Sequence, residues 1–361
     1  MAAGIALHAG WLVGIGSHSR FGILGHGHPS CFNNNSSGWN LFPSHILSDG
    51  VPGYDAMPSP ISDCLVIGAG PAGLTSAIYL ARFRLQVTVI ESGHGRASSI
   101  PKTRNHAGFP NGISGKALVA RMREQASLYG VHPRRGTVTA LARHRAGFVA
   151  ATTLGPIRAR AVLLATGIAD RRPPMSPAVH DRALTNGLLR YCPVCDGYEV
   201  SGKRLGVFGT GAHGAKEAEF LRSFSSDVTL INPSGRHQLT APMRRHLKKL
   251  SVQVLDGPAA GVILKQGGLS VCIGTERHSF STVYSALGAD VHSGLAAALK
   301  AKRTSQGCLF VDAHQRTTVP GLYAAGDVVA GLNQISHAMG SAAVAAVAVR
   351  NDLAERRPLL Y

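Results

Sequence analysis

Along residues 61–361, short apolar runs alternate with segments in which apolar residues recur at helical spacing. Residues 63–67 form an apolar run suited to a buried parallel strand. Residues 74–82 follow at helical spacing, and residues 86–91 form a second apolar run that ends in an acid. The order strand, helix, strand predicts a βαβ unit with a parallel sheet.

A second βαβ unit is predicted further along the chain. Residues 204–209 and 227–232 have the pattern of strands, and residues 215–224 between them have that of a helix. Two copies of the same supersecondary unit in one chain predict two α/β domains, which agrees with a length of 361 residues at roughly 150 residues per domain.

The first unit contains a G-x-G-x-x-G loop between its strand and its helix. Gly68 permits the tight turn, Gly70 lets the backbone approach a pyrophosphate, and Gly73 lets the helix lie close to the strand. The pyrophosphate would sit at the positive end of the helix, and Glu91 would bind ribose hydroxyls. The cofactor-binding residues predicted here are Gly68, Gly70, Pro71, Ala72, Gly73 and Glu91.

Two later strand ends indicate that this first nucleotide is a flavin nucleotide. One apolar run ends in a tight turn at Gly167, and another ends in Gly326-Asp327, whose carboxylate can face the ribityl or phosphate portion of a flavin. The small apolar residues of 334–350 predict a tightly packed helix whose N-terminus can stabilise negative charge on a reduced flavin. These strand and helix ends add five predicted cofactor-binding residues: Gly167, Gly326, Asp327, Gln334 and Ile335.

The second unit contains its own G-x-G-x-x-G loop, for which a nicotinamide dinucleotide is the expected ligand. At the end of its second strand, Asn232-Pro233 replaces the expected acid, and Arg236 and His237 are the cations that follow. The choice between NADPH and NADH therefore stays open, as does the alternative that this unit keeps the fold without binding a nicotinamide. The predicted binding residues are Gly209, Gly211 and Gly214.

Two of the six cysteines, Cys192 and Cys195, have C-x-x-C spacing and lie between the two units. Zinc would need four ligands, and no second pair stands nearby, so we predict a redox-active pair and no metal site. A short C-x-x-C loop at a helix start favours a thiolate and an easily reduced disulfide. Asp196 can carry a proton between solvent and a departing thiolate; the alternative is a helix-capping carboxylate. Cys64 and Cys272 are predicted to be buried small hydrophobic residues.

Charge and composition narrow the classes of function. Lys and Arg total 37 against 19 for Asp and Glu, and the whole excess lies in residues 61–361. Because these cations are scattered without interleaved aromatic residues, we expect no nucleic-acid binding and at most a field that steers acidic partners. The sequence contains no run of about 18 uncharged apolar residues, so we expect no membrane span. Residues 1–60 are predicted to be a disordered extension, and Met57 is a hypothetical native start.

The motifs together resemble the low-molecular-weight thioredoxin reductase family of flavoprotein disulfide reductases, over residues 61–355. Its redox cysteines open the nicotinamide domain, as Cys192-Pro-Val-Cys195-Asp196 does here. Further matching segments are the two glycine loops, Gly326-Asp327, Gly108-Phe109-Pro110 and Gly112-Ile-Ser-Gly115.

The resemblance implies a role for each residue of the redox motif. Cys195 would face the flavin, Cys192 would form the mixed disulfide with the substrate, and Asp196 would be the acid–base group. Glu91 would bind the adenosine ribose of FAD, and the resemblance also gives Asp327 and Gln334 contacts with the flavin nucleotide. A homodimer is implied as well, and so is a domain rotation that presents the dithiol alternately to flavin and to substrate.

The resemblance also implies an architecture of two Rossmann-like three-layer α/β domains, with the nicotinamide domain inserted into the FAD domain. We expect the FAD domain to comprise residues 61–172 and 303–361, and the NAD(P)-binding domain with the redox pair to comprise residues 173–302. A redox-active pair with few other cysteines fits the cytoplasm.

Two departures from the family leave the direction of electron flow open. Residues 231–234 replace a basic cluster that holds the NADPH 2′-phosphate in bacterial reductases, and Gly197-Tyr198-Glu199 resembles dithiol oxidases of the same superfamily. The leading hypothesis is a reductase that uses FAD and NADPH or NADH to reduce thioredoxin or a similar dithiol partner. The alternative is an FAD-dependent oxidase that closes a disulfide in a small molecule or protein and passes electrons to oxygen. A non-enzymatic redox-sensing module is a third hypothesis, which the intact redox motif disfavours.

Overall fold

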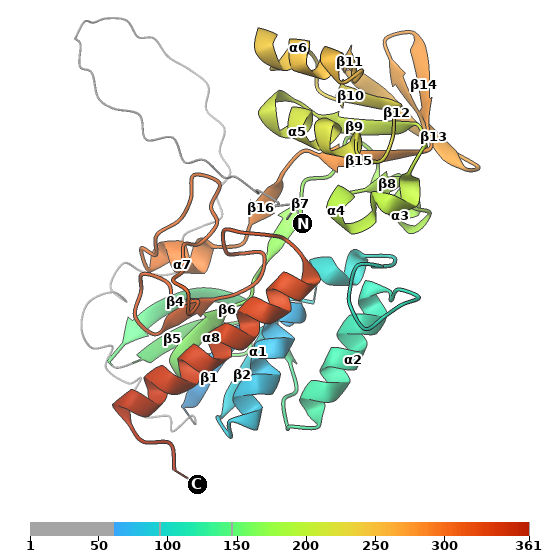
Figure 1. Cartoon of the computed structure of the whole chain (residues 1–361). Helices are drawn as coiled ribbons and strands as arrows, with labels where there is room; N and C mark the ends of the chain where they lie inside the picture. The colour runs from blue at the N-terminus through green and yellow to red at the C-terminus, as the bar shows by residue number, and fades with distance from the viewer. Residues whose placement is uncertain (1–60, 94, 146, 361) are drawn as a thin grey trace, which may run out of the picture. The chain divides into compact units, whose positions relative to one another are not determined.

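Two β-sheets organise the described part of the chain, each built around one of the predicted βαβ units (Figure 1). The structure is a computed structural model that describes residues 61–93, 95–145 and 147–360. The expectations for residues 1–60, including Met57 and Cys31, lie outside the described residues.

The first sheet has the strand order β3-β2-β1-β6-β5-β4, and β17 also pairs with β6. Strands β1, β2, β3, β6 and β17 are parallel, whereas β4, β5 and β6 form an antiparallel meander. The strands are β1 (Ser62–Ile67), β2 (Val87–Glu91), β3 (Arg134–Arg135), β4 (Val138–His144), β5 (Gly147–Thr152), β6 (Ile157–Leu164) and β17 (Leu322–Ala324).

Helices cover one face of this sheet, namely α1 (Pro71–Arg82), α2 (Gly115–Ser127) and α8 (Ile335–Arg356). Alternate residues of β1 divide between the two faces: Cys64 packs with the helices, and Leu65 packs into the opposite core. That opposite core contains residues of the β4–β5 hairpin and of α7 (Gly294–Ala298). The third layer of this domain therefore contains strands as well as a helix.

The second sheet is fully parallel, in the order β11-β10-β9-β15-β8. Helices α5 and α6 pack on one face, and the antiparallel sheet β12-β13-β14 packs with α3 on the other. The elements are α3 (Pro177–Thr185), β8 (Leu189–Arg190), β9 (Leu205–Gly209), α5 (Gly211–Leu221), β10 (Val228–Asn232), α6 (Ala241–Lys249), β11 (Gln253–Asp256), β12 (Ala259–Lys265), β13 (Gly268–Ile273), β14 (Glu276–Phe280) and β15 (Thr282–Ala286).

A two-stranded antiparallel ribbon lies where the chain passes between the two sheets. It consists of β7 (Ile168–Asp170) and β16 (Ala289–Val291), with Ala289 opposite Asp170. The division into residues 61–172, 173–302 and 303–361 stays a prediction.

Three short elements surround the redox pair and the first nucleotide loop: η3 (Arg96–Ser99), α4 (Pro193–Asp196) and η4 (Tyr198–Val200). The helix that the C-x-x-C opens is thus a single turn. In the second unit, α5 begins at Gly211, because the glycine loop itself forms the first helical turn, and not at residue 215 as the pattern predicted. Among the helices of the described residues, none combines the length and apolar character that crossing a bilayer requires.

Candidate active site

A cavity of about 620 Å³ contains the redox cysteines and most of the predicted flavin-binding residues. The predicted residues that line it are Gly68, Gly70, Pro71, Ala72, Glu91, Gly167, Cys192, Cys195, Asp196, Gly326, Asp327, Gln334 and Ile335. Among the described residues, Gly73 and the second loop's Gly209, Gly211 and Gly214 do not line this cavity. The fold thus brings segments up to 270 positions apart into one site.

The first glycine loop has the geometry of a dinucleotide cradle. Gly68 has φ +107°, and a Cβ there would overlap the carbonyl oxygen of Ala165. A Cβ at Gly73 would overlap the carbonyl oxygen of Gly68, so this glycine serves the close packing of α1 on the loop. At Gly70 a Cβ would meet no atom within 4 Å, so the backbone there faces the open cavity. These positions fit the pyrophosphate of FAD at the start of α1.

Glu91 ends β2 and lines the same cavity, as a ribose-binding acid would. Its Oε2 accepts a hydrogen bond of 2.6 Å from Nη2 of Arg123 on α2. Arg123 also lines the cavity, and no sequence motif marked it. The arginine fixes the carboxylate at the cavity wall.

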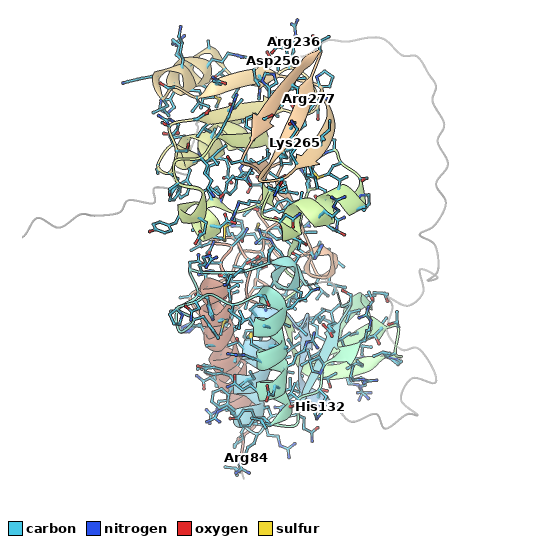
Figure 2. All side chains as sticks on the ribbon, turned by 90° about the vertical axis from the view of Figure 1, so that its right-hand side faces the viewer. Arg84, His132, Arg236, Asp256, Lys265 and Arg277 are labelled. Atoms are coloured by element: carbon cyan, nitrogen blue, oxygen red, sulfur yellow. A yellow bond between two sulfur atoms is a disulfide. The ribbon has the colours of Figure 1, made fainter. Side chains whose placement is uncertain are left out.

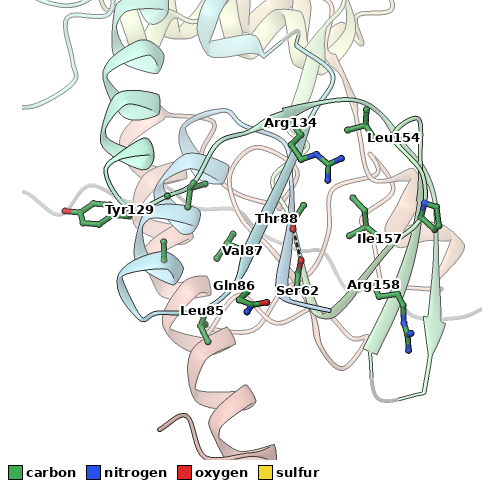
Figure 3. Close-up of a pocket in the computed structure, with 14 residues that line it drawn as sticks. Ser62, Leu85, Gln86, Val87, Thr88, Tyr129, Arg134, Leu154, Ile157 and Arg158 are labelled. Carbon is green, nitrogen blue, oxygen red and sulfur yellow. Dashed lines mark hydrogen bonds between the residues drawn. The ribbon is translucent and has the colours of Figure 1, made fainter. Parts of the chain in front are cut away.

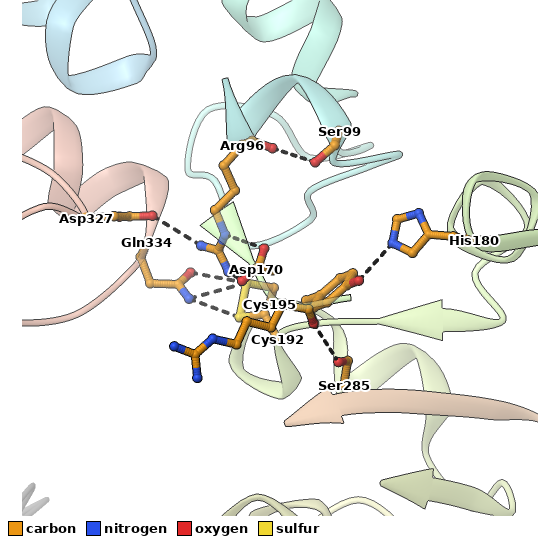
Figure 4. A network of polar contacts seen from close by, with 11 residues as sticks. Arg96, Ser99, Asp170, His180, Cys192, Cys195, Ser285, Asp327 and Gln334 are labelled. Atoms are coloured by element: carbon orange, nitrogen blue, oxygen red, sulfur yellow. Dashed lines mark hydrogen bonds and ion pairs between the residues drawn. A yellow bond between two sulfur atoms is a disulfide. The ribbon is translucent and has the colours of Figure 1, made fainter. Parts of the chain in front are cut away.

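Asp327 belongs to a three-residue charge network (Figure 4). Arg96 donates to Asp170 over 2.7 and 3.0 Å and to Asp327 over 3.2 Å. Burial raises the pKa of Asp327, and the Arg96 charge opposes that rise. Arg96 comes from η3, Asp170 from β7 and Asp327 from the loop after β17. This network therefore connects Asp327, the predicted flavin-binding carboxylate, to the ribbon between the sheets.

The redox cysteines form a disulfide, with their Cα atoms 5.3 Å apart. Cys192 precedes α4 as its N-cap, and its carbonyl accepts a hydrogen bond of 3.0 Å from the Cys195 amide. Gln334 Nε2 lies 3.3 Å from each sulfur (Figure 4). The sequence predicted Gln334 as a flavin ligand and did not predict its contact with the disulfide.

Asp196 is the last residue of α4 and does not cap the start of the helix. Its carboxylate accepts from Arg190 Nη1 over 2.6 Å and from the Tyr284 hydroxyl over 2.8 Å. Arg190 and Tyr284 are opposite each other on the parallel strands β8 and β15, which places both donors beside the redox turn. Burial raises the pKa of Asp196, and the two donors oppose that rise. A carboxyl group whose neutral form is favoured in this way is suited to donate a proton.

A second polar chain reaches the cavity through Tyr191, the residue before Cys192. His180 Nε2 lies 2.8 Å from the Tyr191 hydroxyl (Figure 4). His180 Nδ1 lies 2.9 Å from Asp181 Oδ1. Burial raises the pKa of Tyr191, so this phenol stays protonated at neutral pH. These contacts connect Tyr191 at the cavity, through the buried His180, to the exposed carboxylate of Asp181.

The loop after β10 explains the missing acid of the second nucleotide unit. Asn232 is buried; its Nδ2 donates to the carbonyl of Arg236 over 2.7 Å, and its Oδ1 accepts from the Ser234 amide over 3.0 Å. His237 is buried too, and burial lowers its pKa, so it carries little charge at neutral pH. Of the two cations that the sequence offered, the exposed one is Arg236, close to Asp256 at the end of the second sheet (Figure 2).

A second cavity, of about 540 Å³, lies beside the first sheet (Figure 3). Ser62 Oγ and Thr88 Oγ1, 2.6 Å apart, are part of its wall, with Tyr129 and two arginines, Arg134 and Arg158. None of the predicted site residues lines it. The chemistry therefore concentrates in the cavity that contains the disulfide.

Comparison with known proteins places the chain in a family. It belongs to the pyridine nucleotide-disulphide oxidoreductases, whose family model matches residues 62–342. The thioredoxin reductase of Aquifex aeolicus is 28% identical over 331 residues, covering 84% of this chain and 97% of that protein. The thioredoxin reductase of Mycolicibacterium smegmatis is 30% identical over 315 residues, covering 82% of this chain and 98% of that protein.

A solved structure gives the same result. The crystal structure of thioredoxin reductase from Streptococcus pyogenes matches with a TM-score of 0.75 and 27% identity, covering 82% of this chain and 99% of that chain. These likenesses confirm the resemblance drawn from the motifs, the fold of two Rossmann-like domains and the enzyme class, an NAD(P)H:disulfide oxidoreductase.

Proposed function

We propose that this protein passes electrons from NADPH through FAD and the Cys192–Cys195 disulfide to thioredoxin or a similar dithiol partner. The observation that supports this most is the shared cavity: the disulfide, the proton-donating Asp196 and the glycine cradle of the first nucleotide line one space. A structural disulfide would need no such neighbours.

FAD, when bound, takes a hydride from the nicotinamide and donates two electrons to a disulfide. The chain would hold its pyrophosphate at Gly68, Gly70 and the start of α1, and its adenosine ribose at Glu91. Asp327 and the α8 start at Ile335 would bind the flavin portion, and Gly167 and Gly326 leave backbone room there. The positive end of α8 would favour the negative charge of the reduced ring.

In the substrate step, Cys192 attacks one sulfur of the partner's disulfide. A bond forms between the two sulfurs, and the partner's second sulfur departs with the electron pair and takes a proton from Asp196. Cys195 then loses its proton to solvent and attacks the Cys192 sulfur, which reforms the disulfide of this chain and releases the first partner sulfur as a thiolate that takes a proton from solvent. Two electrons have moved to the partner, and Asp196 regains its proton from solvent.

For the nicotinamide we propose the second glycine loop, with Gly209 at the end of β9 and Gly211 and Gly214 in the first turn of α5. Gly209 and Gly214 pack closely, because a Cβ on Gly214 would lie 2.7 Å from the Gly209 carbonyl carbon. Arg236 is the cation that would meet a 2′-phosphate. NADH is the alternative coenzyme.

The decisive experiment is an anaerobic titration of the purified holoenzyme with NADPH and, separately, with NADH, followed by flavin absorbance near 450 nm. We expect stoichiometric bleaching by one coenzyme, and then thioredoxin-dependent reoxidation. If neither coenzyme bleaches the flavin but a dithiol does, the reductase proposal is wrong.

The second candidate, an FAD-dependent dithiol oxidase that uses oxygen, needs no nicotinamide. Two observations favour it: Asn232 is engaged in its own loop, and Tyr198 stands 81% exposed next to the redox turn, where a small dithiol could contact it. Dithiol-driven bleaching, with hydrogen peroxide formed on readmission of oxygen, would support it.

Three further proposals come from the family resemblance. We propose that residues 173–302 form the nicotinamide domain inserted between residues 61–172 and 303–361, that the enzyme is a homodimer, and that it works in the cytoplasm. A basic excess in residues 61–361 would then steer an acidic protein partner, and no nucleic acid is involved.

A further inference from the structure

The redox disulfide has a side-chain amide of Gln334 directed at both of its sulfurs. Gln334 Nε2 is 3.3 Å from Cys192 Sγ and 3.3 Å from Cys195 Sγ. An amide nitrogen carries two protons, so one donor group can serve both sulfurs. We propose that Gln334 is a catalytic residue that stabilises the thiolate formed when this disulfide is reduced.

The orientation of the Gln334 amide follows from its neighbours. The carbonyl oxygen of Val194 can only accept, and Asn105 Nδ2 lies 3.4 Å from it, while Asn105 Oδ1 accepts from the Thr103 hydroxyl over 2.9 Å. The same Nδ2 donates to Gln334 Oε1 over 3.0 Å. Because Oε1 is held by Asn105, Nε2 must face the sulfurs.

These contacts come from opposite sides of the cavity. Gln334 is the N-cap residue of α8 and has extended backbone, and Asn105 lies between η3 and α2. Val194 and the cysteines belong to the redox turn, next to the second sheet. Asn105 and Gln334 therefore bind the redox turn from the side of the first sheet, where the flavin would lie.

The amide distinguishes the oxidised from the reduced pair through charge. Two electrons break the S–S bond and leave two sulfur anions, of which one takes a proton and the other stays a thiolate. A hydrogen bond to a neutral disulfide sulfur is weak, whereas one to a thiolate is charge-assisted and about twice as strong. Gln334 Oε1 lies 3.7 Å from Cys195 Sγ, but this contact is no hydrogen bond in the disulfide, because that sulfur carries no proton.

Two consequences follow, and they rest on the proposed function only in that the electrons normally arrive from reduced flavin. The lower thiol pKa of the reduced pair should be depressed by the amide, and the equilibrium between disulfide and dithiol should be displaced toward the dithiol. A dithiol reductant such as dithiothreitol supplies the same two electrons, and it is itself oxidised to a cyclic disulfide. Both consequences can therefore be measured without nicotinamide, thioredoxin or oxygen.

The test replaces Gln334 by Met, which has a similar length and no donor. The holoenzyme is reduced with dithiothreitol, the reductant is removed under argon, and the rate of iodoacetamide alkylation of the Cys192–Cys195 peptide is followed by mass spectrometry from pH 5 to 10. We expect the pH midpoint of alkylation to rise by about one unit, because the variant loses one charge-assisted hydrogen bond to the thiolate. The matched control is Gln266→Met, in the exposed turn between β12 and β13, with an unchanged midpoint.

A second variant, Gln334→Glu, decides the matter if the methionine variant does not fold. Glu retains an acceptor for Asn105 but turns an oxygen toward the sulfurs, so we expect an upward shift larger than that of Gln334→Met, because like charges now face each other. Midpoints equal to wild type in a folded Gln334 variant would overturn the inference.

The two proposals fail separately. A shifted midpoint in an enzyme whose flavin neither NADPH nor NADH reduces would leave the role of Gln334 intact and remove the reductase function. Full NADPH-dependent turnover with no shift in either variant would support the reductase function and overturn the role of Gln334.

Discussion

At the scale of single residues, the carboxylate of Asp196 has neighbours that act on its pKa in opposite directions. Burial raises the pKa, and Arg190 and Tyr284 oppose the rise by stabilising the anion. The balance leaves the pKa above its usual range, which keeps a proton available for a departing thiolate. The position of Asp196 directly after Cys195 predicted its role as a proton carrier. Its proton affinity, however, depends on Arg190 and Tyr284, which lie on two strands of the second sheet.

Replacing Tyr284 by Phe tests that balance. Loss of the hydroxyl donor destabilises the anion, so the pKa of Asp196 should rise further, by about half a unit to one unit. The alkaline limb of the pH–rate profile for disulfide exchange should move to higher pH by that amount, because the protonated carboxyl persists longer. Stopped-flow rates from pH 5 to 9 measure it.

A matched control for this variant is Tyr323→Phe. Tyr323 is also a buried tyrosine that donates to a carboxylate, Asp352, but it lies on β17 away from the disulfide. It should leave the pH profile in place. An unchanged profile in Tyr284→Phe would show that Asp196 does not set this limb.

At the scale of elements, neighbouring glycines of the first βαβ unit have different structural roles. Gly73 serves the packing of α1 on the loop, and Gly70 borders open space. Both roles were assigned from the motif spacing. The backbone geometry fits close packing at Gly73, and the approach of a pyrophosphate to Gly70 stays a prediction. Such roles can be assigned from the sequence because the turn, the helix start and the strand are all local in it.

The glycine pair supplies its own control. Gly73→Ala should destabilise the flavin-free protein by about 1–3 kcal/mol, since the new methyl group must displace the Gly68 carbonyl. Gly70→Ala should leave that stability nearly unchanged, because its backbone is extended and no atom is near, but it should lose FAD. Urea unfolding and the flavin-to-protein absorbance ratio separate the two effects. Equal losses of stability would contradict the assignment.

At the scale of the whole described fold, Arg96 connects parts that are far apart in sequence. It binds Asp170 on the ribbon between the sheets and Asp327 beside β17. Its side chain is 25% exposed, so the pairs are partly shielded from water. Arg96 therefore connects the loop after β17, where the flavin is predicted to bind, to the ribbon between the two sheets.

Arg96→Met should lower the free energy of unfolding at pH 7 by about 3 kcal/mol, because it leaves two partly buried carboxylates without their cation. The pKa of Asp327, already raised by burial, should rise further in this variant. The deficit should therefore shrink as the pH falls and Asp327 takes up a proton. Urea unfolding at pH 5 and 7 measures both effects.

The ribbon also offers a control for Arg96. Arg171 pairs with Asp290 over 2.7 Å, but both side chains are more than half exposed, so Arg171→Met should change stability by less than about 1 kcal/mol. Equal losses in the two variants, or a deficit in Arg96→Met that does not depend on pH, would argue against the role given to Arg96.

Sequence patterns alone predicted the strands and helices of both βαβ units, apart from the start of α5, and also the glycine cradle, the redox pair and Asp196. All of these depend on residues within a few positions of one another, where backbone conformation and hydrophobic periodicity are legible. The sequence also predicted Glu91 and Asp327 at one edge of a sheet, because parallel strands deliver their carboxyl ends there, and Gln334 at the start of a helix.

The partners of those residues could be identified only in the folded structure. The contacts of Arg96 with Asp327, of Arg190 and Tyr284 with Asp196, and of Asn105 with Gln334 at the disulfide join residues up to 231 positions apart and follow no motif. Hydrogen bonds and ion pairs depend on distances within about 3 Å, and such distances are set by how sheets, helices and loops pack. The chain thus encodes the type of chemistry locally, and the folded cavity sets how strongly each group holds its proton or its charge.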